Sequence, residues 1–209
     1  ETQLSDAPRD VLSKRARDVV RTAGATPVYY TEWCSSSNPF FHRHDEPYAA
    51  AFLMKNMLDV SDQVQAYSWW TFSDIFEENY FSSIPFHGGF GLMTKDGVRK
   101  SSWFAYKYLN ALKGNEIPSA DSQVWAAYDG HSVSAVVWDF QLPDQKGSSN
   151  KTFFSKLVPN QKSRPVHLTV SGLQPGNYKL SVHRTGYKVN DAYSAYIDMG
   201  LPKTLTADQ

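Results

Sequence analysis

The feature that constrains this chain most is an alternation of helix-like and strand-like segments through residues 1–113. Three stretches place apolar residues at the helical period. Between them lie two runs rich in β-branched and aromatic residues, "TPVYYTEW" (26–33) and "QVQAYSWWTFSD" (63–74). The order helix–strand–helix–strand–helix predicts parallel strands joined by helical crossovers. Two strands alone cannot form a parallel sheet that is buried on both faces. We therefore expect this half to be part of a larger α/β structure.

Local signals predict where the three helices begin and end. The first has a cap candidate at Ser5 or Asp6 and ends at Gly24. The second, "EPYAAAFLMKNMLD", starts near Pro47, and the third, "SSWFAYKYLNALKG", closes at Gly114. Proline suits a first turn because its missing N–H is not needed there, and glycine after a last turn ends the helix without steric cost.

The second half of the chain changes to the period of strands. Asp129-Gly130 in "QVWAAYDGHSVSAVVWDF" is a strong hairpin signal, and Pro175-Gly176 joins a second pair of runs in "PVHLTVSGLQPGNYKLSVHRTGY". We interpret residues 120–200 as an antiparallel β-sandwich or part of one. The predicted domains are 1–114, which is α/β, and 115–209, which is β-sandwich.

Charge and hydropathy exclude several kinds of partner. Lys plus Arg number 21 and Asp plus Glu number 21, so no basic surplus is present to attract nucleic acid or an anionic membrane. The longest apolar runs are far shorter than the roughly 20 residues of a membrane helix. Cys34, the single cysteine, excludes an internal disulfide. The opening "ETQLSDAPRD" carries no signal-peptide pattern, so the compartment stays undecided, with a secreted or periplasmic location favoured.

Glu32 lies where the first strand-like run ends. The plainer interpretation is an ordinary exposed carboxylate at the edge of a sheet. The segment that follows, "WCSSSNPFFHRHDEP" (33–47), favours a functional one. A long loop with one tryptophan and two phenylalanines is costly to expose unless it lines a pocket. In α/β barrels the carboxyl ends of the strands also hold the active site.

Acidic and aromatic residues gather after the second strand as well. The run "SWWTFSDIFEENYFSSIPFHGGFGL" (68–92) contains Asp74, Glu77, Glu78, Trp69, Trp70, Phe72 and His87. Carboxylates accept paired hydrogen bonds from hydroxyl groups and rings cover an apolar sugar face, so this mixture is typical of a carbohydrate site. The alternative is that Trp69 or Trp70 faces a core while Asp74 caps a turn. Because side chains alternate along a strand, the alternative must hold for some of them.

Weaker signals point to no metal and no cofactor. "HRHD" (42–45) resembles a metal cluster, but Asp45 better suits a cap for the helix that begins near Pro47. "HGGFG" (87–91) lacks the spacing of a dinucleotide-binding loop. Cys34 has no nucleophile-elbow sequence around it, and we assign it no role.

Three motifs resemble the last third of a glycoside hydrolase family 39 barrel: "YYTEWCSSSNP", "YSWWTFSDIFEE" and "FHGGFGL…DGVRKSSWFAYKYLNAL". That family holds β-xylosidases and α-L-iduronidases. The resemblance covers residues 5–113. Residues 120–209 resemble the family's accessory domain more loosely, through "HRTGYKVNDAYSAYIDMGLP". The implied fold class is α/β plus β: the last part of a (β/α)8 TIM barrel followed by an antiparallel β-sandwich domain.

The resemblance also implies roles for single residues. Glu32 matches the catalytic nucleophile at the end of the seventh barrel strand. The residues that would shape the sugar subsite are Trp70, Glu77, Glu78, Phe86 and His87. Which of Glu77 and Glu78 faces the sugar stays open.

The implied reaction is retaining hydrolysis of a xyloside or related pyranoside, in which a second carboxylic acid assists Glu32. The family carries that acid in an Asn-Glu-Pro motif, which this chain lacks. "DEP" (45–47) indicates a helix start and "NEI" (115–117) a linker. We therefore expect a piece of a family 39 enzyme that holds the nucleophile without the general acid/base. It would be inactive until the N-terminal part of the barrel completes the site.

Other substrates and functions remain as alternatives. An iduronide would need a cationic partner, for which Arg43 and Arg99 are the candidates, whereas "FSDIFEE…FHGGFG" favours a xyloside. A non-catalytic carbohydrate-binding or scaffold protein could keep the same motifs. A structural β-sandwich with an α/β appendage would make all these carboxylates surface charges.

Overall fold

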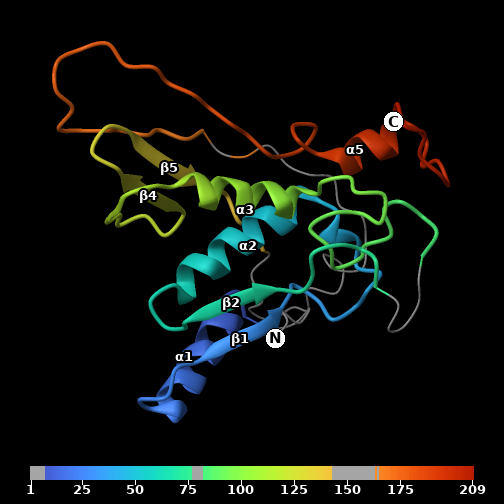
Figure 1. Cartoon of the computed structure of the whole chain (residues 1–209), viewed down its shortest axis with the longest axis horizontal. Coiled ribbons are helices and arrows are strands. Elements are labelled where there is room, and N and C mark those ends of the chain that lie inside the picture. Colours follow the sequence, from blue (N-terminus) through green and yellow to red (C-terminus); the bar gives the residue numbers. More distant parts are fainter. Residues whose placement is uncertain (1–7, 77–81, 143–162, 164) are drawn as a thin grey trace.

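The protein's computed structural model describes residues 8–76, 82–142, 163 and 165–209 (Figure 1). In chain order the elements are α1 (Val11–Ala23), β1 (Tyr29–Trp33), a 3₁₀ turn (His42–His44), α2 (Pro47–Val60), β2 (Ala66–Trp69), α3 (Ser101–Ala111), β3 (Asn115–Ile117), β4 (Val124–Tyr128), β5 (Val133–Val137) and α5 (Ala192–Asp198). The predicted helix–strand alternation up to residue 113 is confirmed. None of the helices in these ranges is long and apolar enough to span a membrane.

Two of the predicted helix limits hold. α2 begins at Pro47, and Gly24 ends α1 by adopting a φ of 61° while its N–H donates to the Val20 carbonyl. α1 starts at Val11, later than the sequence suggests, and Ser5 and Asp6 lie outside the described residues.

The prediction that Gly114 closes α3 is wrong, because the helix ends at Ala111 with Leu112 as its cap. Gly114 has a φ of 87°, and a Cβ there would lie 2.1 Å from the Tyr128 carbonyl oxygen. Its lack of a side chain allows the chain to approach β4 closely.

β1 and β2 form a parallel pair with an irregular register. Tyr30 is opposite Tyr67 and Trp33 is opposite Trp69, so β1 has two residues, Thr31 and Glu32, where β2 has one. This is the geometry of a β-bulge, which re-aims side chains at the end of a strand.

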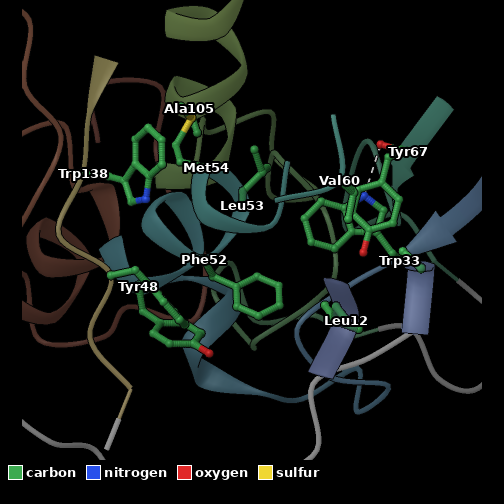
Figure 2. Close-up of a cluster of buried hydrophobic side chains, with 12 residues drawn as sticks. Leu12, Trp33, Tyr48, Phe52, Leu53, Met54, Val60, Tyr67, Ala105 and Trp138 are labelled. Atoms are coloured by element: carbon green, nitrogen blue, oxygen red, sulfur yellow. Dashed lines mark hydrogen bonds between the residues drawn. The ribbon is translucent and has the colours of Figure 1, made fainter. Parts of the chain in front are cut away.

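One apolar cluster fills the space between this sheet and the helices (Figure 2). Phe52 of α2 is fully buried, with its ring centroid 5.8 Å from that of Trp33. Trp33 stacks on Tyr67 at 4.2 Å and donates its Nε1–H to the Tyr67 carbonyl, the bond dashed in Figure 2. Trp138 and Phe140, which follow β5, belong to the same cluster. Residues on both sides of the predicted 114/115 boundary thus share a core, and the division into two domains stays a prediction.

β3, β4 and β5 form an antiparallel sheet in that order. The hairpin at Asp129-Gly130 is confirmed. The Asp129 carboxylate accepts from the amides of His131 and Ser132, and Gly130 has a φ of 96°. "NEI" is not a linker as expected, since it pairs with β4 as β3. Three residues are too short a run to show the period of a strand.

The second predicted hairpin, in residues 165–187, is wrong for the described residues. The chain there runs without strand structure, as the long loop at the top left of Figure 1. Alternate apolar side chains along both arms are exposed: Val166, Leu168, Val170, Tyr178, Leu180 and Val182. A two-stranded ribbon is marginal unless its apolar face is covered, and within the described residues these apolar side chains stay exposed, which explains the missing ladder. Of the predicted sandwich, the described part of the chain forms one three-stranded sheet.

Candidate active site

The carboxyl ends of β1 and β2 lie side by side because the two strands are parallel. The Trp70 N–H donates to the Trp33 carbonyl at 2.9 Å, so the pairing continues one residue beyond β2. The Trp70–Thr71 peptide bond is cis. A carboxylate from one strand, Glu32, and an indole from the next, Trp70, are thus brought to the same edge of the sheet.

Because of the bulge, Tyr30 and Trp33 both pack toward the core, while Thr31 and Glu32 between them are exposed. Trp33 is 1% exposed and anchored in the core, whereas Glu32 and its neighbour across the pair, Ser68, are exposed. The buried ring holds the backbone at the strand end. The carboxylate beside it therefore has a fixed point of attachment and access to solvent.

The segment 87–91 packs tightly against the chain beyond both strands. A Cβ on Gly88 would lie 2.6 Å from the Phe41 backbone. A Cβ on Gly89 would lie 2.4 Å from the Asp74 carboxylate, and one on Gly91 would lie 2.4 Å from the Asp74 amide nitrogen. Close approach of the backbone explains why this segment repeats glycine.

A buried ion network lies against this segment. The Lys100 side chain is 0% exposed, and its Nζ is 2.6 Å from Asp45 Oδ1 and 2.7 Å from Asp74 Oδ2. The same nitrogen donates to the Gly89 carbonyl at 2.9 Å. Burial alone would lower the pKa of Lys100, but the two carboxylates outweigh it and raise that pKa. The ammonium is therefore charged in the folded protein.

Each carboxylate uses its second oxygen to hold the 87–91 backbone. The Gly88 N–H donates to Asp45 Oδ2 and the Gly91 N–H to Asp74 Oδ1, both at 2.7 Å. Burial raises the pKa of Asp45, while Lys100 acts in the opposite direction. The amide donors offset part of the cost of placing two carboxylates beside one ammonium.

Cys34 and His44 form a second buried contact next to this network. Cys34 Sγ is 3.3 Å from His44 Nε2, and His44 Nδ1 is 2.9 Å from the Gly88 carbonyl. A carbonyl can only accept, so Nδ1 carries the proton and Nε2 accepts from the thiol. Burial raises the pKa of Cys34 to about 12 and lowers that of His44 to about 3. Both groups are neutral at pH 7, and the pair lacks the thiolate that nucleophilic catalysis needs.

Comparison with known proteins identifies the family. The whole chain, residues 1–209, matches the family model described as glycosyl hydrolases family 39. The chain belongs to glycosyl hydrolase family 39. A monomeric beta-xylosidase from Caulobacter crescentus CB15 is similar to it, with a TM-score of 0.87 and 47% identity, over 99% of this chain and 43% of that one. A family 39 enzyme from Xanthomonas axonopodis pv. citri gives a TM-score of 0.79 and 39% identity, over 99% and 41%.

Two similar beta-xylosidases are longer than this chain. A beta-xylosidase from Caldicellulosiruptor saccharolyticus is 45% identical over 118 residues, which is 56% of this chain and 24% of the relative. A beta-xylosidase from Geobacillus stearothermophilus is 33% identical over 148 residues, which is 68% of this chain and 29% of the relative. The chain therefore spans less than half the length of each of these four proteins.

The structure describes three of the five subsite residues predicted from the sequence, namely Trp70, His87 and Phe86. Trp70 is half-buried and meets Phe76 edge-on, with ring centroids 5.9 Å apart. His87 is half-buried, its Nδ1 3.2 Å from the Ile84 carbonyl and its ring 5.9 Å from that of Phe40. Both are partly accessible, as contact with a ligand requires.

The other three predicted subsite residues are Phe86, Glu77 and Glu78. Phe86 is buried, with its ring 5.0 Å from Tyr196 and 5.7 Å from Tyr193 of α5, so it ties the 82–87 segment to that helix. Glu77 and Glu78 lie outside the described residues.

The structure corrects the interpretation of one aspartate and decides between the two that the sequence left open for another. Asp45 does not cap α2, whose N-cap is Glu46 and whose first turn receives no side-chain cap bond. Asp74, grouped with the sugar-facing acids, is buried against Lys100, so it cannot face a ligand. The missed residue is Lys100, which lies far along the chain from both partners and has no local signal.

Other candidates raised by the sequence are also accounted for. Arg43 is buried with its Nη1 2.6 Å from Glu46 Oε2, so it is committed to a partner within the protein and not to a uronate. Glu46 of "DEP" belongs to that pair, and Pro47 starts α2 as predicted. Arg99 rests on the Trp103 ring at 4.3 Å. Within the described ranges, no group of three metal-ligating side chains comes together.

Proposed function

We propose that this chain supplies the nucleophile of a retaining glycoside hydrolase that acts on β-xylosides, and that Glu32 is that nucleophile. The observation that carries the proposal is the bulge at the end of β1. It leaves Glu32 exposed at the same end of the strand pair as Trp70, while Trp33 fixes the backbone in the core. Membership of family 39 and the beta-xylosidase relatives support glycosidase chemistry and a xyloside substrate.

In this mechanism Glu32 attacks the anomeric carbon and forms a covalent glycosyl-enzyme, which water then hydrolyses. A second carboxylic acid, roughly 5–5.5 Å away, protonates the leaving oxygen and later activates the water. Asp74 and Glu46 are buried in ion pairs and do not suit that role. The acid would come from strands beyond this chain, which together with β1 and β2 would close a (β/α)8 barrel.

The exposed face of the β1–β2 pair supports this completion. Tyr29, Thr31, Glu32 and Ser68 are all exposed on it, whereas parallel sheets are normally covered on both faces. In the complete barrel these side chains would point to its interior and Glu32 to its mouth. Trp70 and His87 would contact the sugar, with Glu77 and Glu78 close by. Phe86, which packs on α5, would support the subsite from behind. Residues 115–209 would form part of the accessory β-sandwich.

The test is covalent trapping in the full-length protein that contains this chain. An aryl 2-deoxy-2-fluoro-β-xyloside should add one fluoroxylosyl group, and peptide mapping should place it on Glu32. Glu32→Gln should abolish the label, whereas Glu116→Gln, an exposed glutamate on β3, should leave it unchanged.

Two other outcomes would count against parts of the proposal. A label on a different carboxylate would overturn the assignment of Glu32. Saturable xyloside binding without label or hydrolysis would favour a carbohydrate-binding or scaffold protein. The present chain alone should not hydrolyse the substrate, and activity should appear once the remainder of the barrel is added.

A further inference from the structure

We propose that Lys100 is a positioning residue for the proposed reaction: its ammonium fixes Trp70 and His87 relative to Glu32, so that the sugar meets the nucleophile at reacting distance. This inference rests on the proposed function. Lys100 takes part in no chemical step of the proposed reaction, and the sequence did not indicate it.

The ammonium is a junction of three segments. Its acceptors are Asp45 Oδ1 at 2.6 Å, Asp74 Oδ2 at 2.7 Å and the Gly89 carbonyl at 2.9 Å. Asp45 belongs to the chain after β1, Asp74 to the chain after β2, and Gly89 to the loop that follows. The ammonium therefore contacts one oxygen on each of the three segments, two as ion pairs and one as a hydrogen bond.

The anchor itself is rigid. Lys100 is the residue immediately before α3, where its carbonyl accepts from the Trp103 N–H at 3.1 Å. Its own N–H donates to the Leu92 carbonyl at 2.9 Å. The side chain therefore starts from a backbone that is held on both sides, and its buried end has no freedom to move into solvent.

Backbone bonds connect this junction to the two proposed sugar contacts. Asp45 binds the N–H of Gly88, the residue next to His87. Asp74 binds the N–H of Gly91. Thr71, the residue next to Trp70, exchanges backbone bonds with the same loop, donating to Phe90 at 3.1 Å and accepting from Leu92 at 3.0 Å. A shift of either carboxylate would displace both contacts relative to Glu32.

The most informative variant is Asp74→Asn. The two oxygens of Asp74 face different groups: Oδ2 forms an ion pair with Lys100, and Oδ1 accepts from the Gly91 N–H. An asparagine has a single oxygen, so its NH₂ group would face one of these donors and release it. The buried charge of the network becomes smaller, so the variant loosens the loop without adding an unpaired charge. Lys100→Met would instead leave two carboxylates facing each other.

The matched control is Asp59→Asn, which makes the same substitution in another largely buried lysine–aspartate pair of the described residues. Lys55 Nζ and Asp59 Oδ2 are 2.6 Å apart on α2. This pair lies within one helix and bonds neither strand-end loop. A general effect of weakening a lysine–aspartate pair would appear in both variants.

The experiment measures inactivation of the full-length protein by the 2-fluoroxyloside, well below the melting temperature of each variant. The limiting rate reports attack by Glu32, and the half-saturating concentration reports binding. We expect Asp74→Asn to lower the limiting rate about 10²-fold, the effect of roughly 1 Å of misplacement. The half-saturating concentration should change little, and Asp59→Asn should change neither quantity.

The outcomes separate positioning from stability. A purely structural defect would reduce the fraction of protein that becomes labelled and leave the limiting rate of the remainder unchanged, and this would overturn the inference. An Asp74→Asn rate equal to that of the unsubstituted protein would do the same. If Asp74→Asn does not fold, Asp45→Asn releases the ammonium from the β1 side and is expected to give the same loss. Absence of label in the unsubstituted protein would refute the proposed function itself, and this inference with it.

Discussion

Substituting Gly88 by alanine should be among the most destabilising single-methyl changes in the molecule. The φ of 81° costs an alanine about 1–2 kcal/mol. Its Cβ would also lie 2.6 Å from Phe41 backbone atoms, which cannot rotate away and would have to withdraw toward the 3.4 Å of ordinary contact.

That withdrawal would strain the bonds that hold Gly88. They are the Phe41 N–H to the Gly88 carbonyl at 3.1 Å and the Gly88 N–H to the charged Asp45 at 2.7 Å. A neutral hydrogen bond contributes about 1 kcal/mol and one to a charged group about 1.5–3 kcal/mol. With the backbone strain, the free energy of unfolding should fall by about 4 kcal/mol.

The assay is urea unfolding at pH 7, followed by tryptophan fluorescence, with Gly24→Ala as the control. Gly24 also has a positive φ, 61°, but no atom lies within 4 Å of a Cβ built there, so only the backbone strain of about 1–2 kcal/mol should be lost. Equal losses in the two variants would refute the reasoning, because the close packing of 87–91 on Phe41 would then contribute nothing.

Three further predictions concern the buried groups. Burial lowers the pKa of His44 from 6.5 to about 3. Stability of about 5 kcal/mol is therefore present above pH 6.5 and lost as the pH falls toward 3. Burial raises the pKa of Glu46 from 4.5 to about 7. The free energy of unfolding therefore gains a contribution from Glu46 as the pH falls from 7 to 4.5. The two effects offset each other between pH 6.5 and 4.5, so the resistance of the protein to urea should fall only below about pH 4.5. In Glu46→Gln the resistance should already fall below pH 6.5. Identical pH profiles of the variant and the unsubstituted protein would contradict this. Phe52→Ala should lower the free energy of unfolding by about 3–5 kcal/mol, measured the same way; a loss below 1 kcal/mol would contradict full burial. The Cys34 thiol, with its pKa raised to about 12, should react with a disulfide reagent at pH 8 only on unfolding.

Structure that depends on neighbours in sequence could be predicted. Pro47 marks the start of α2, Gly24 the end of α1, and Asp129-Gly130 the β4–β5 turn, because each acts on the backbone within a few residues. The position of Glu32 at a strand end was predicted for the same reason. Its exposure through a bulge was not, since register depends on the partner strand.

Features that depend on distant partners could not be predicted. Asp45 has the sequence context of a helix cap, yet in the fold it forms a buried ion pair with Lys100. No local sequence pattern predicts that pair. The arms around Pro175-Gly176 have the alternation of strands, but a strand also needs a neighbour with which to exchange hydrogen bonds. Local preference permits such elements, and tertiary partners decide whether they form.

The close packing of the 87–91 loop has a consequence for how this part of the molecule can change over time. The space where a Cβ would lie is occupied at Gly88 by the Phe41 backbone, and at Gly89 and Gly91 by Asp74 and its neighbours. No volume remains there for an added methyl group. A substitution in any of the three segments would be tolerated only if the other two moved or changed with it. The loop, the 40–45 turn and the start of the chain after β2 should therefore vary among descendants of this sequence as one unit, whatever happens to the helices around them.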